Sequence, residues 1–498
     1  MGNVINTRRF SFRQRLKYHF IEKKMNTFLG YFFLTVFAAA VTSGIALIDY
    51  KIGIMVIALC FGIITFLVIM RWPYFGFYFT IAFASLTITV DRITMSSVTS
   101  GNAVEFFTYL GLLSILLKYD LKKNINVRFY ANPITVCIYF LFAYYIVEFF
   151  NPEMFSRIGW VSFFRKQFSY FVFYYMCYCL LDSREKIIFF IRFMITLTSL
   201  LALYACKQQM FGYAGFELRW IGTGSGYSLL LQGGLLRKFS VFSDPATSGI
   251  LFAAISLLCV IILFRSKNKK ERYWLAAATM VNLMGYSFSG TRTATLMIIA
   301  GIVFYCLSAI FERRTMIFLI YSVLTFVILM VMPFQNVVTN RIRSTFEGTK
   351  DRSAAIRDYD RKEVQPYIQA HPLGGGIFTS GGEGTKYNRG HYLEYLQADS
   401  GYMKNVAEQG PVGFVFLLAF YFVIMRVGFR SFYRVNDPEI RTYYIGLLVM
   451  IFSLFVAQYS QMAITQYPVV LYFYATMIIF IKLADFDTNV QPENTKQI

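Results

Sequence analysis

Apolar residues run in long unbroken stretches along most of this chain. We count about fourteen stretches, and about twenty apolar residues in a helix are enough to cross the hydrocarbon core of a bilayer. The short alternating segments typical of a membrane β-barrel are not seen. The pattern therefore predicts an all-α polytopic membrane protein with about 12–14 transmembrane helices. The stretches are centred near residues 38, 61, 82, 110, 141, 173, 196, 255, 281, 302, 325, 418, 450 and 472.

Polar segments between these stretches predict how the chain is organised. The large external loop contains a charged, helical-looking segment, Ala354–Ala370, so we expect an ordered subdomain there rather than a merely solvated loop. The five predicted parts are a basic N-terminal arm at 1–26, transmembrane helices at 27–332 with an outer loop at 207–245, the large external loop at 333–409, C-terminal transmembrane helices at 410–483, and a tail at 484–498.

Composition agrees with a membrane protein and excludes several other classes. Of the 498 residues, 57% are hydrophobic and only 15% are charged, whereas soluble domains carry about 25% charged residues. A single soluble domain, a disordered chain and a small disulfide-rich module are therefore excluded. The seven cysteines lie in or beside apolar stretches without CxxC spacing. We therefore interpret them as small buried side chains and expect neither a disulfide framework nor a zinc site.

The basic residues predict the orientation of the chain in the membrane. The net charge is +21, and Lys and Arg are enriched in cytoplasmic connections of membrane proteins. Alternate connections carry clusters of bases that include Lys118, Arg265 and Arg426, whereas the short connections between them carry little more than Lys51 or Arg92. This asymmetry predicts that both termini lie in the cytoplasm and that the two long loops lie outside.

Two arginines are expected at the outer border of the membrane. Arg237 and Lys238 precede a Phe-Ser-Asp-Pro turn, and Arg292 ends a Ser-Gly-Thr-Arg turn one helical hairpin later. An arginine at this depth is costly unless it is paired or bound to an anion, and its planar fork suits phosphate oxygens. These residues are therefore candidates to bind a diphosphate. The alternative is that each arginine simply extends to lipid headgroups.

The end of the large loop carries the candidates for acid–base chemistry. If residues 391–399 are helical, His391, Tyr395 and Asp399 share one helix face, and an imidazole or carboxylate can activate a hydroxyl. Asp399 could equally cap a helix that starts at Ser400. The sequence has three histidines and no DxD motif, so we predict metal-independent chemistry without a cofactor. Secondary site candidates are His371, Arg341, Arg361 and Glu408.

These motifs together resemble the O-antigen ligase and polymerase family of bacterial membrane proteins. The resemblance covers roughly residues 200–430. It is carried by Arg237 before the Phe242–Pro245 turn, the Ser289–Arg292 turn, the His371–Gly376 segment, and the Asp399–Tyr402 and Glu408–Gly413 signatures. It implies a glycosyltransferase with a GT-C-like fold in the bacterial inner membrane. The implied donor is a glycan on undecaprenyl diphosphate.

The resemblance leaves the acceptor open. Asp399 stands where ligases of the family are expected to carry a histidine, which favours a polymerase that extends a lipid-linked repeat unit. The alternatives within the family are an O-antigen ligase and a protein O-oligosaccharyltransferase. Expected partners are the lipid-linked oligosaccharide, membrane lipids, a flippase and a chain-length regulator, but no nucleic acid.

Two other function classes make different demands on the sequence. A lipid-linked oligosaccharide flippase or transporter should carry titratable residues deep in several helices, because its cargo crosses the membrane. Here they crowd the outer border, with Glu105 and Arg192 as the main exceptions. A structural member of an envelope complex would leave the two arginine turns unexplained.

Overall fold

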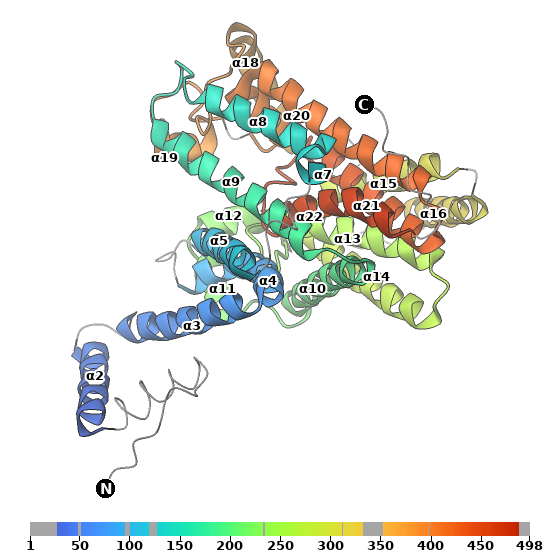
Figure 1. The fold of residues 1–498 in the computed structure, drawn as a ribbon. Helices are drawn as coiled ribbons and strands as arrows, with labels where there is room; N and C mark the ends of the chain where they lie inside the picture. The colour runs from blue at the N-terminus through green and yellow to red at the C-terminus, as the bar shows by residue number, and fades with distance from the viewer. Residues whose placement is uncertain are drawn as a thin grey trace. The chain divides into compact units, whose positions relative to one another are not determined.

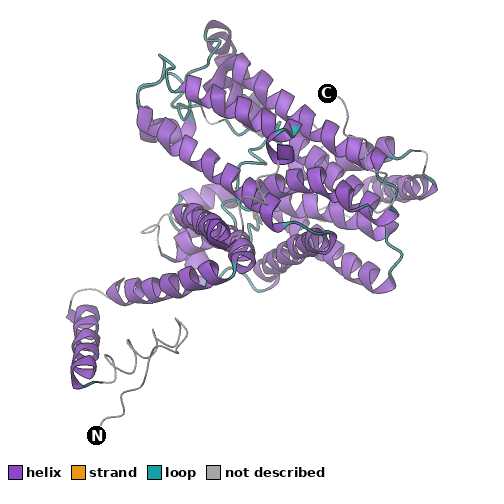
Figure 2. Cartoon of the chain, viewed as in Figure 1, coloured by secondary structure: helices purple, strands orange, loops and turns teal. Residues whose placement is uncertain are grey.

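The computed structural model of the chain describes eight segments and two compact units. The units are Met1–Trp72 and Pro73–Ile498, and each is described by itself. Helices make up most of the described chain (Figures 1 and 2). The described residues are 27–47, 51–94, 100–118, 127–232, 235–310, 312–331, 352–396 and 398–487.

The described part of the first unit consists of two apolar helices that contact each other. Helix α2 spans Phe28–Leu47 and carries no charged residue. Helix α3 spans Lys51–Arg71, and its only charged residues are the two at its ends. Both helices are apolar, and they contain the centres of the first two predicted stretches, near residues 38 and 61.

The second unit contains the remaining helices and one minimal β-ladder. In this ladder the two-residue strands β1 (Leu231–Gln232) and β2 (Leu235–Leu236) pair antiparallel, with Leu231 opposite Leu236. The helices are α4 (Pro73–Ile93), α5 (Ser100–Lys118), α7 (Val127–Tyr130), α8 (Pro133–Glu148), α9 (Arg157–Leu180), α10 (Arg184–Met210), α11 (Gly215–Ile221), α12 (Ser225–Leu230), α13 (Pro245–Arg265), α14 (Lys269–Ser289), α15 (Arg292–Ser308), α16 (Arg313–Val331), α18 (Arg352–Ala370), α19 (Gly381–Tyr387), α20 (Gly401–Arg434), α21 (Pro438–Ala457), α22 (Val469–Lys482) and the 3₁₀ turn η4 (Leu483–Phe486).

The predicted all-α polytopic membrane fold is confirmed. Every predicted centre falls inside a described helix, from residue 38 in α2 to residue 472 in α22. Seven described helices are long and apolar enough to cross a membrane: α4, α5, α10, α13, α20, α21, and α22 with its 3₁₀ extension. The predicted helix at Ala354–Ala370 is also confirmed, as α18.

Helices α13 and α21 lie at the centre of the second unit. In each, 83% of the membrane-length window is buried, against 28% in α20, and α13 packs on α14, α15 and α21. A helix that is apolar on all sides lies in a protein core or in a membrane, and here other helices surround most of α13. The first turn of α13, which begins at Pro245, is therefore held by neighbours on several sides.

Local sequence explains how α13, α14 and α15 meet. Asp244 caps α13 by accepting a hydrogen bond from the backbone N–H of Thr247 at 2.9 Å, and Pro245 occupies the first helical position, where proline is favoured. Helix α14 ends at Gly290, whose left-handed backbone (φ 58°) closes the helix as glycine commonly does. Helix α15 starts two residues later at Arg292, so the two helices form a tight hairpin.

The segment His371–Gly376, called the His-Pro-Leu segment below, and the bend in α20 form one structural unit. Gly410 interrupts α20 with φ 67° and ψ 179°, as the Gly410-Pro411 pair predicts. The N–H groups of Gly375 and Gly376 donate to the carbonyls of Ala407 and Glu408 at 2.9 and 2.8 Å. Backbone contact this close explains the glycines of both motifs.

The condition that residues 391–399 are helical is not met in the described part of this segment. Residues 391–396 form turns, and α20 begins only at Gly401. Ser400, and not Asp399, caps α20 through its hydroxyl, which accepts from the N–H of Met403 at 3.2 Å. His391 is buried while Tyr395 is 84% exposed, so they share no face. Leu393 is also fully buried, and burial of these side chains against the loop outweighs the local helical spacing.

Contacts between the helix ends sort the connections of the second unit into two sets. One set joins the α10, α13, α20–α21 and α22 ends through bonds such as Arg184–Asp437 (2.9 Å) and Arg265–Glu312 (2.5 Å). The other joins the α4–α5, α10–α13, α14–α15, α16–α20 and α21–α22 connections through bonds such as Arg92–Ser243, Thr293–Ser460 and Arg361–Tyr459. Which set faces the cytoplasm stays a prediction.

Candidate functional site

Arg237 binds the turn that carries Arg292. Its Nε donates to the carbonyl of Ser289 at 2.8 Å and its Nη2 to the hydroxyl of Thr291 at 3.0 Å. The N–H of Lys238 donates to the carbonyl of Phe288 at 3.1 Å. Arg292 directly follows Thr291, so the structure brings the two predicted arginines together on adjoining backbone segments.

The first turn of α13 fixes the position of this arginine pair. The hydroxyl of Thr291 donates to the carbonyl of Pro245 at 2.8 Å. A Cβ at Gly249 would lie 2.3 Å from the hydroxyl oxygen of Ser289, so only glycine allows this approach of α13 to the turn. The arginine turn therefore rests on one of the two helices at the centre of the unit.

Arg92 is a part of this site that the sequence analysis missed. Its side chain lies over the rings of Trp220 and Phe239, with 3.9 and 4.3 Å from the guanidinium carbon to the ring centroids. It donates to the carbonyl of Ser243 at 2.9 Å and is only 8% exposed. Arg92 thus holds the segment between Arg237 and α13. In the sequence Arg92 marks only a short connection with few basic residues, and no local motif marks its partner Ser243, which is 151 residues away.

Lys238 lies beside Arg237 in the chain, but its ammonium is directed into the outer loop. It lies over the Tyr213 ring, 4.4 Å from the centroid, and 3.3 Å from the Tyr213 hydroxyl. Burial lowers the pKa of Lys238, and the carboxylate of Glu217 opposes that shift. The lysine therefore contributes to the packing of this loop as well as to its positive charge.

The connection between α21 and α22 links Arg292, Asp399 and Arg361. Ser460 shares a hydrogen bond of 2.8 Å with Thr293, next to Arg292. Arg361 of α18 donates to the Tyr459 hydroxyl at 2.9 Å. The carbonyl of Gln458, in the same connection, accepts hydrogen bonds from the Ser400 hydroxyl at 3.3 Å and from the Gly401 N–H at 3.0 Å. Residues 458–460 are thus bordered by three predicted site segments.

Asp399 and His391 lie in different surroundings. Asp399 is exposed at the start of α20. His391 is 4% exposed, and its ring packs on Phe155 with centroids 5.3 Å apart. Its Nδ1 accepts from the N–H of Leu393 at 3.0 Å. Burial lowers the pKa of His391; the charge of Glu153 opposes this shift and His371 adds to it.

The remaining secondary candidates take part in packing contacts within the large loop. The His371 ring stacks on Tyr367 with centroids 4.1 Å apart, and its Nδ1 lies 2.8 Å from the Tyr367 carbonyl. Glu408 is 3% exposed and accepts from the Ser380 hydroxyl at 2.5 Å. Arg341 lies outside the described residues. Within the described segments no three His, Cys, Asp or Glu side chains group as metal ligands would, and metal independence stays a prediction.

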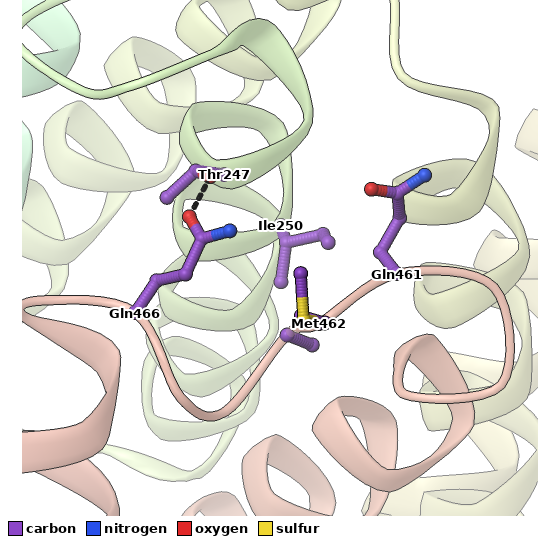
Figure 3. Close-up of a pocket in the computed structure, with 6 residues that line it drawn as sticks. Thr247, Ile250, Gln461, Met462 and Gln466 are labelled. Atoms are coloured by element: carbon purple, nitrogen blue, oxygen red, sulfur yellow. Dashed lines mark hydrogen bonds between the residues drawn. The ribbon is translucent and has the colours of Figure 1, made fainter. Parts of the chain in front are cut away.

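A small pocket opens between the start of α13 and the α21–α22 connection (Figure 3). The Thr247 hydroxyl, on one wall, is hydrogen-bonded to the Gln466 carboxamide oxygen. The lining residues are Thr247, Ile250, Gln461, Met462, Ala463 and Gln466.

Comparison with known proteins agrees with the motifs. Residues 279–418 match the family model described as O-antigen ligase. The matched segment starts in α14 and ends in α20, so it includes Arg292, Asp399 and the whole of the large loop. No curated protein matches the chain. The resemblance drawn from the sequence is confirmed over this segment: residues 279–418 of this membrane protein are similar to the O-antigen ligase family.

Proposed function

We propose that this protein is a polysaccharide polymerase of the bacterial inner membrane. It transfers a glycan from undecaprenyl diphosphate to a lipid-linked repeat unit at the outer face. Proteins of the O-antigen ligase family are glycosyltransferase-like enzymes that act on lipid-linked oligosaccharides. The observation that carries the proposal is the contact between Arg237 and the Ser289–Thr291 turn, which joins the Arg237 guanidinium to the backbone segment that leads directly into Arg292.

The arginine pair suits the departure of a diphosphate. In the transfer, the acceptor hydroxyl oxygen forms a bond to the anomeric carbon of the donor sugar. The bond from that carbon to the phosphate oxygen breaks, and its electron pair stays on the diphosphate. Positive groups fixed in advance stabilise such developing charge without having to reorganise. Arg237 is fixed through two hydrogen bonds, and the backbone of Arg292 lies in the first turn of α15.

Asp399 is the better candidate to receive the acceptor proton. It is exposed and lies next to Ser400, which contacts the α21–α22 connection. His391 is enclosed among aromatic rings, and its Nδ1 already accepts a backbone hydrogen bond. We therefore assign acceptor activation to the Asp399 carboxylate, with Arg361 as a further positive group near the same connection.

The competing functions are weaker for specific reasons. An O-antigen ligase or a protein O-oligosaccharyltransferase would use the same donor site, and Asp399 in place of a histidine favours the polymerase. A flippase would need ionisable groups available within its helices. Here Glu105 is paired with Arg165 at 2.9 Å and Arg192 with Glu271 at 3.2 Å, so these charges are already compensated by the protein.

The test uses purified protein and undecaprenyl-diphosphate-linked repeat units extracted from the producing bacterium. We expect a ladder of longer lipid-linked glycans without any other protein. Arg237→Ala and Arg292→Ala should each reduce extension by about 10²–10³-fold, the usual loss when one anion-stabilising group is removed. Arg219→Ala, at an exposed arginine of the same outer loop, is the matched control. A normal ladder from both variants would rule out the arginine site, and transfer only to lipid A core would identify a ligase.

A further inference from the structure

Ser240 lies in a turn that suits glycine better than serine. Its φ is 55°, and it is one of two non-glycine residues with a left-handed backbone in the described part of the chain. The N–H of Phe242 donates to the carbonyl of Phe239 at 3.1 Å, so Ser240 occupies the second position of a β-turn. Turns with a positive φ at this position are dominated by glycine, asparagine and aspartate. A serine keeps such a conformation only where its surroundings hold it.

The side chain of Gln208, near the end of α10, holds both backbone polar groups of Ser240. Its Oε1 accepts from the Ser240 N–H at 2.8 Å, and its Nε2 donates to the Ser240 carbonyl at 2.9 Å. Because an N–H only donates and a carbonyl only accepts, these two bonds fix the orientation of the carboxamide. The Nε2 also donates to a carboxylate oxygen of Glu217 at 2.6 Å. All three residues are at most 1% exposed, so these bonds are shielded from water.

This turn lies between two segments that are each held by other elements. Before it, Arg237 and Lys238 bind the end of α14. After it, Thr89 and Arg92 of α4 donate to backbone carbonyls at 3.1 and 2.9 Å. The direction of the chain between the two segments depends on the φ of Ser240. Relaxation of this φ to the ordinary negative region would therefore move Arg237 away from the end of α14.

We propose that Gln208 is a positioning residue for the transfer reaction. It holds the left-handed turn at Ser240 and so sets Arg237 against the turn that leads into Arg292. The proposal deepens the proposed function and rests on it. Gln208 itself does not contact the diphosphate, and its effect on the rate passes through Arg237. Such an effect is large, because a displacement of about 1 Å in a catalytic site can cost about 10²-fold in rate.

The first test compares two neighbouring glutamines in the extension assay with purified full-length protein and undecaprenyl-diphosphate-linked repeat units. Gln208→Met keeps the size of the side chain but removes both bonds to Ser240, so kcat should fall by about 10²-fold. KM should change less, because the charge that Arg237 stabilises is largest as the diphosphate leaves. Gln209→Met, at an exposed glutamine, is the matched control and should change neither. Gln208→Asn, which is shorter by one methylene, takes the place of Gln208→Met if that variant is not recovered in folded form.

The second test asks whether Gln208 acts through the backbone of Ser240. Ser240→Gly and Ser240→Ala both remove the hydroxyl, but only glycine adopts a positive φ without steric cost. In the Gln208→Met protein, Ser240→Gly should restore kcat by about 5–30-fold, the factor that corresponds to the left-handed penalty of a residue with a β-carbon. Ser240→Ala should restore nothing, because it keeps that penalty.

The third test asks whether the effect passes through Arg237. Combined with Arg237→Ala, Gln208→Met should cost little more, so the two losses should not multiply. Equal kcat in Gln208→Met and Gln209→Met, equal restoration by glycine and alanine at position 240, or losses that multiply would each overturn the positioning role. An absent ladder from the wild type would instead overturn the proposed function. A normal ladder from Arg237→Ala would overturn the part of Arg237 in the reaction, and the positioning role with it.

Discussion

Asp399 and His391 can be separated as candidates for acceptor activation by conservative substitutions. Asp399→Asn keeps the size of the side chain but removes the base. General base catalysis typically contributes about 10²–10⁴-fold, so extension should fall within that range. His391→Gln retains a hydrogen-bond acceptor and should cost much less. The measurement is kcat/KM for chain extension, and a larger loss in His391→Gln than in Asp399→Asn would reverse the assignment.

His391 should also make the large loop sensitive to acid. Burial lowers its pKa below the ordinary value of 6.5, so the folded state favours the neutral ring. This contribution to stability is complete above pH 6.5 and is lost as the pH falls from there through the lower folded pKa. Protonation would also remove the Nδ1 lone pair that accepts from Leu393.

The acid sensitivity can be measured as the change in Tm of the detergent-solubilised protein between about pH 7.5 and about pH 5.5. Wild type should lose Tm over this interval. His391→Phe preserves an aromatic ring beside Phe155 but cannot titrate, so its Tm should fall less, whatever its value at neutral pH. Equal falls in the two proteins would show that groups other than His391 control the acid response.

The packing of helix α20 against the His-Pro-Leu segment should require glycine at position 410. Gly410 has a backbone conformation that is open essentially to glycine alone, at a cost of about 1–3 kcal/mol for other residues, and a Cβ there would lie 2.0 Å from the Pro372 carbonyl oxygen. Gly410→Ala should therefore lower Tm and the yield of folded protein. Gly382→Ala is the control, because a Cβ at that position meets nothing within 4 Å. A Tm for Gly410→Ala equal to that of the control would contradict this interdependence.

At the scale of elements, the sequence predicts a feature when the residues that determine it are close together in the chain. Apolar stretches predicted the helices because membrane insertion depends on the hydrophobicity of one continuous segment. The arginine turns could be predicted because α13, α14 and α15 are consecutive, so their ends meet without distant partners. Arg92 and Tyr459 could not be predicted, since their partners Ser243 and Arg361 lie far away in sequence. The conformation of residues 391–399 could not be predicted, because tertiary burial decides it.

At the scale of the whole molecule, the predicted membrane orientation can be tested with the contacts of the second unit. The set that joins Arg184 to Asp437 and Arg265 to Glu312 contains short connections that carry clusters of basic residues. The other set contains the arginine turn and the large loop. The positive-inside tendency assigns the first set to the cytoplasm, and a glycan donor that is extended outside requires the second set to face away from it.

The direct measurement is labelling of single cysteines by a membrane-impermeant maleimide in right-side-out vesicles. The native cysteines are first replaced by alanine. Five of the seven are buried, and replacing each of these leaves a small cavity. We expect Tyr395→Cys and Thr465→Cys to label in intact vesicles, and Lys267→Cys, which is exposed on the other set, to label only after the membrane is opened. The reverse labelling pattern would show that Arg237 and Arg292 face the cytoplasm. Polymerisation at the outer face would then be impossible, even though every helix and contact described above would be unchanged.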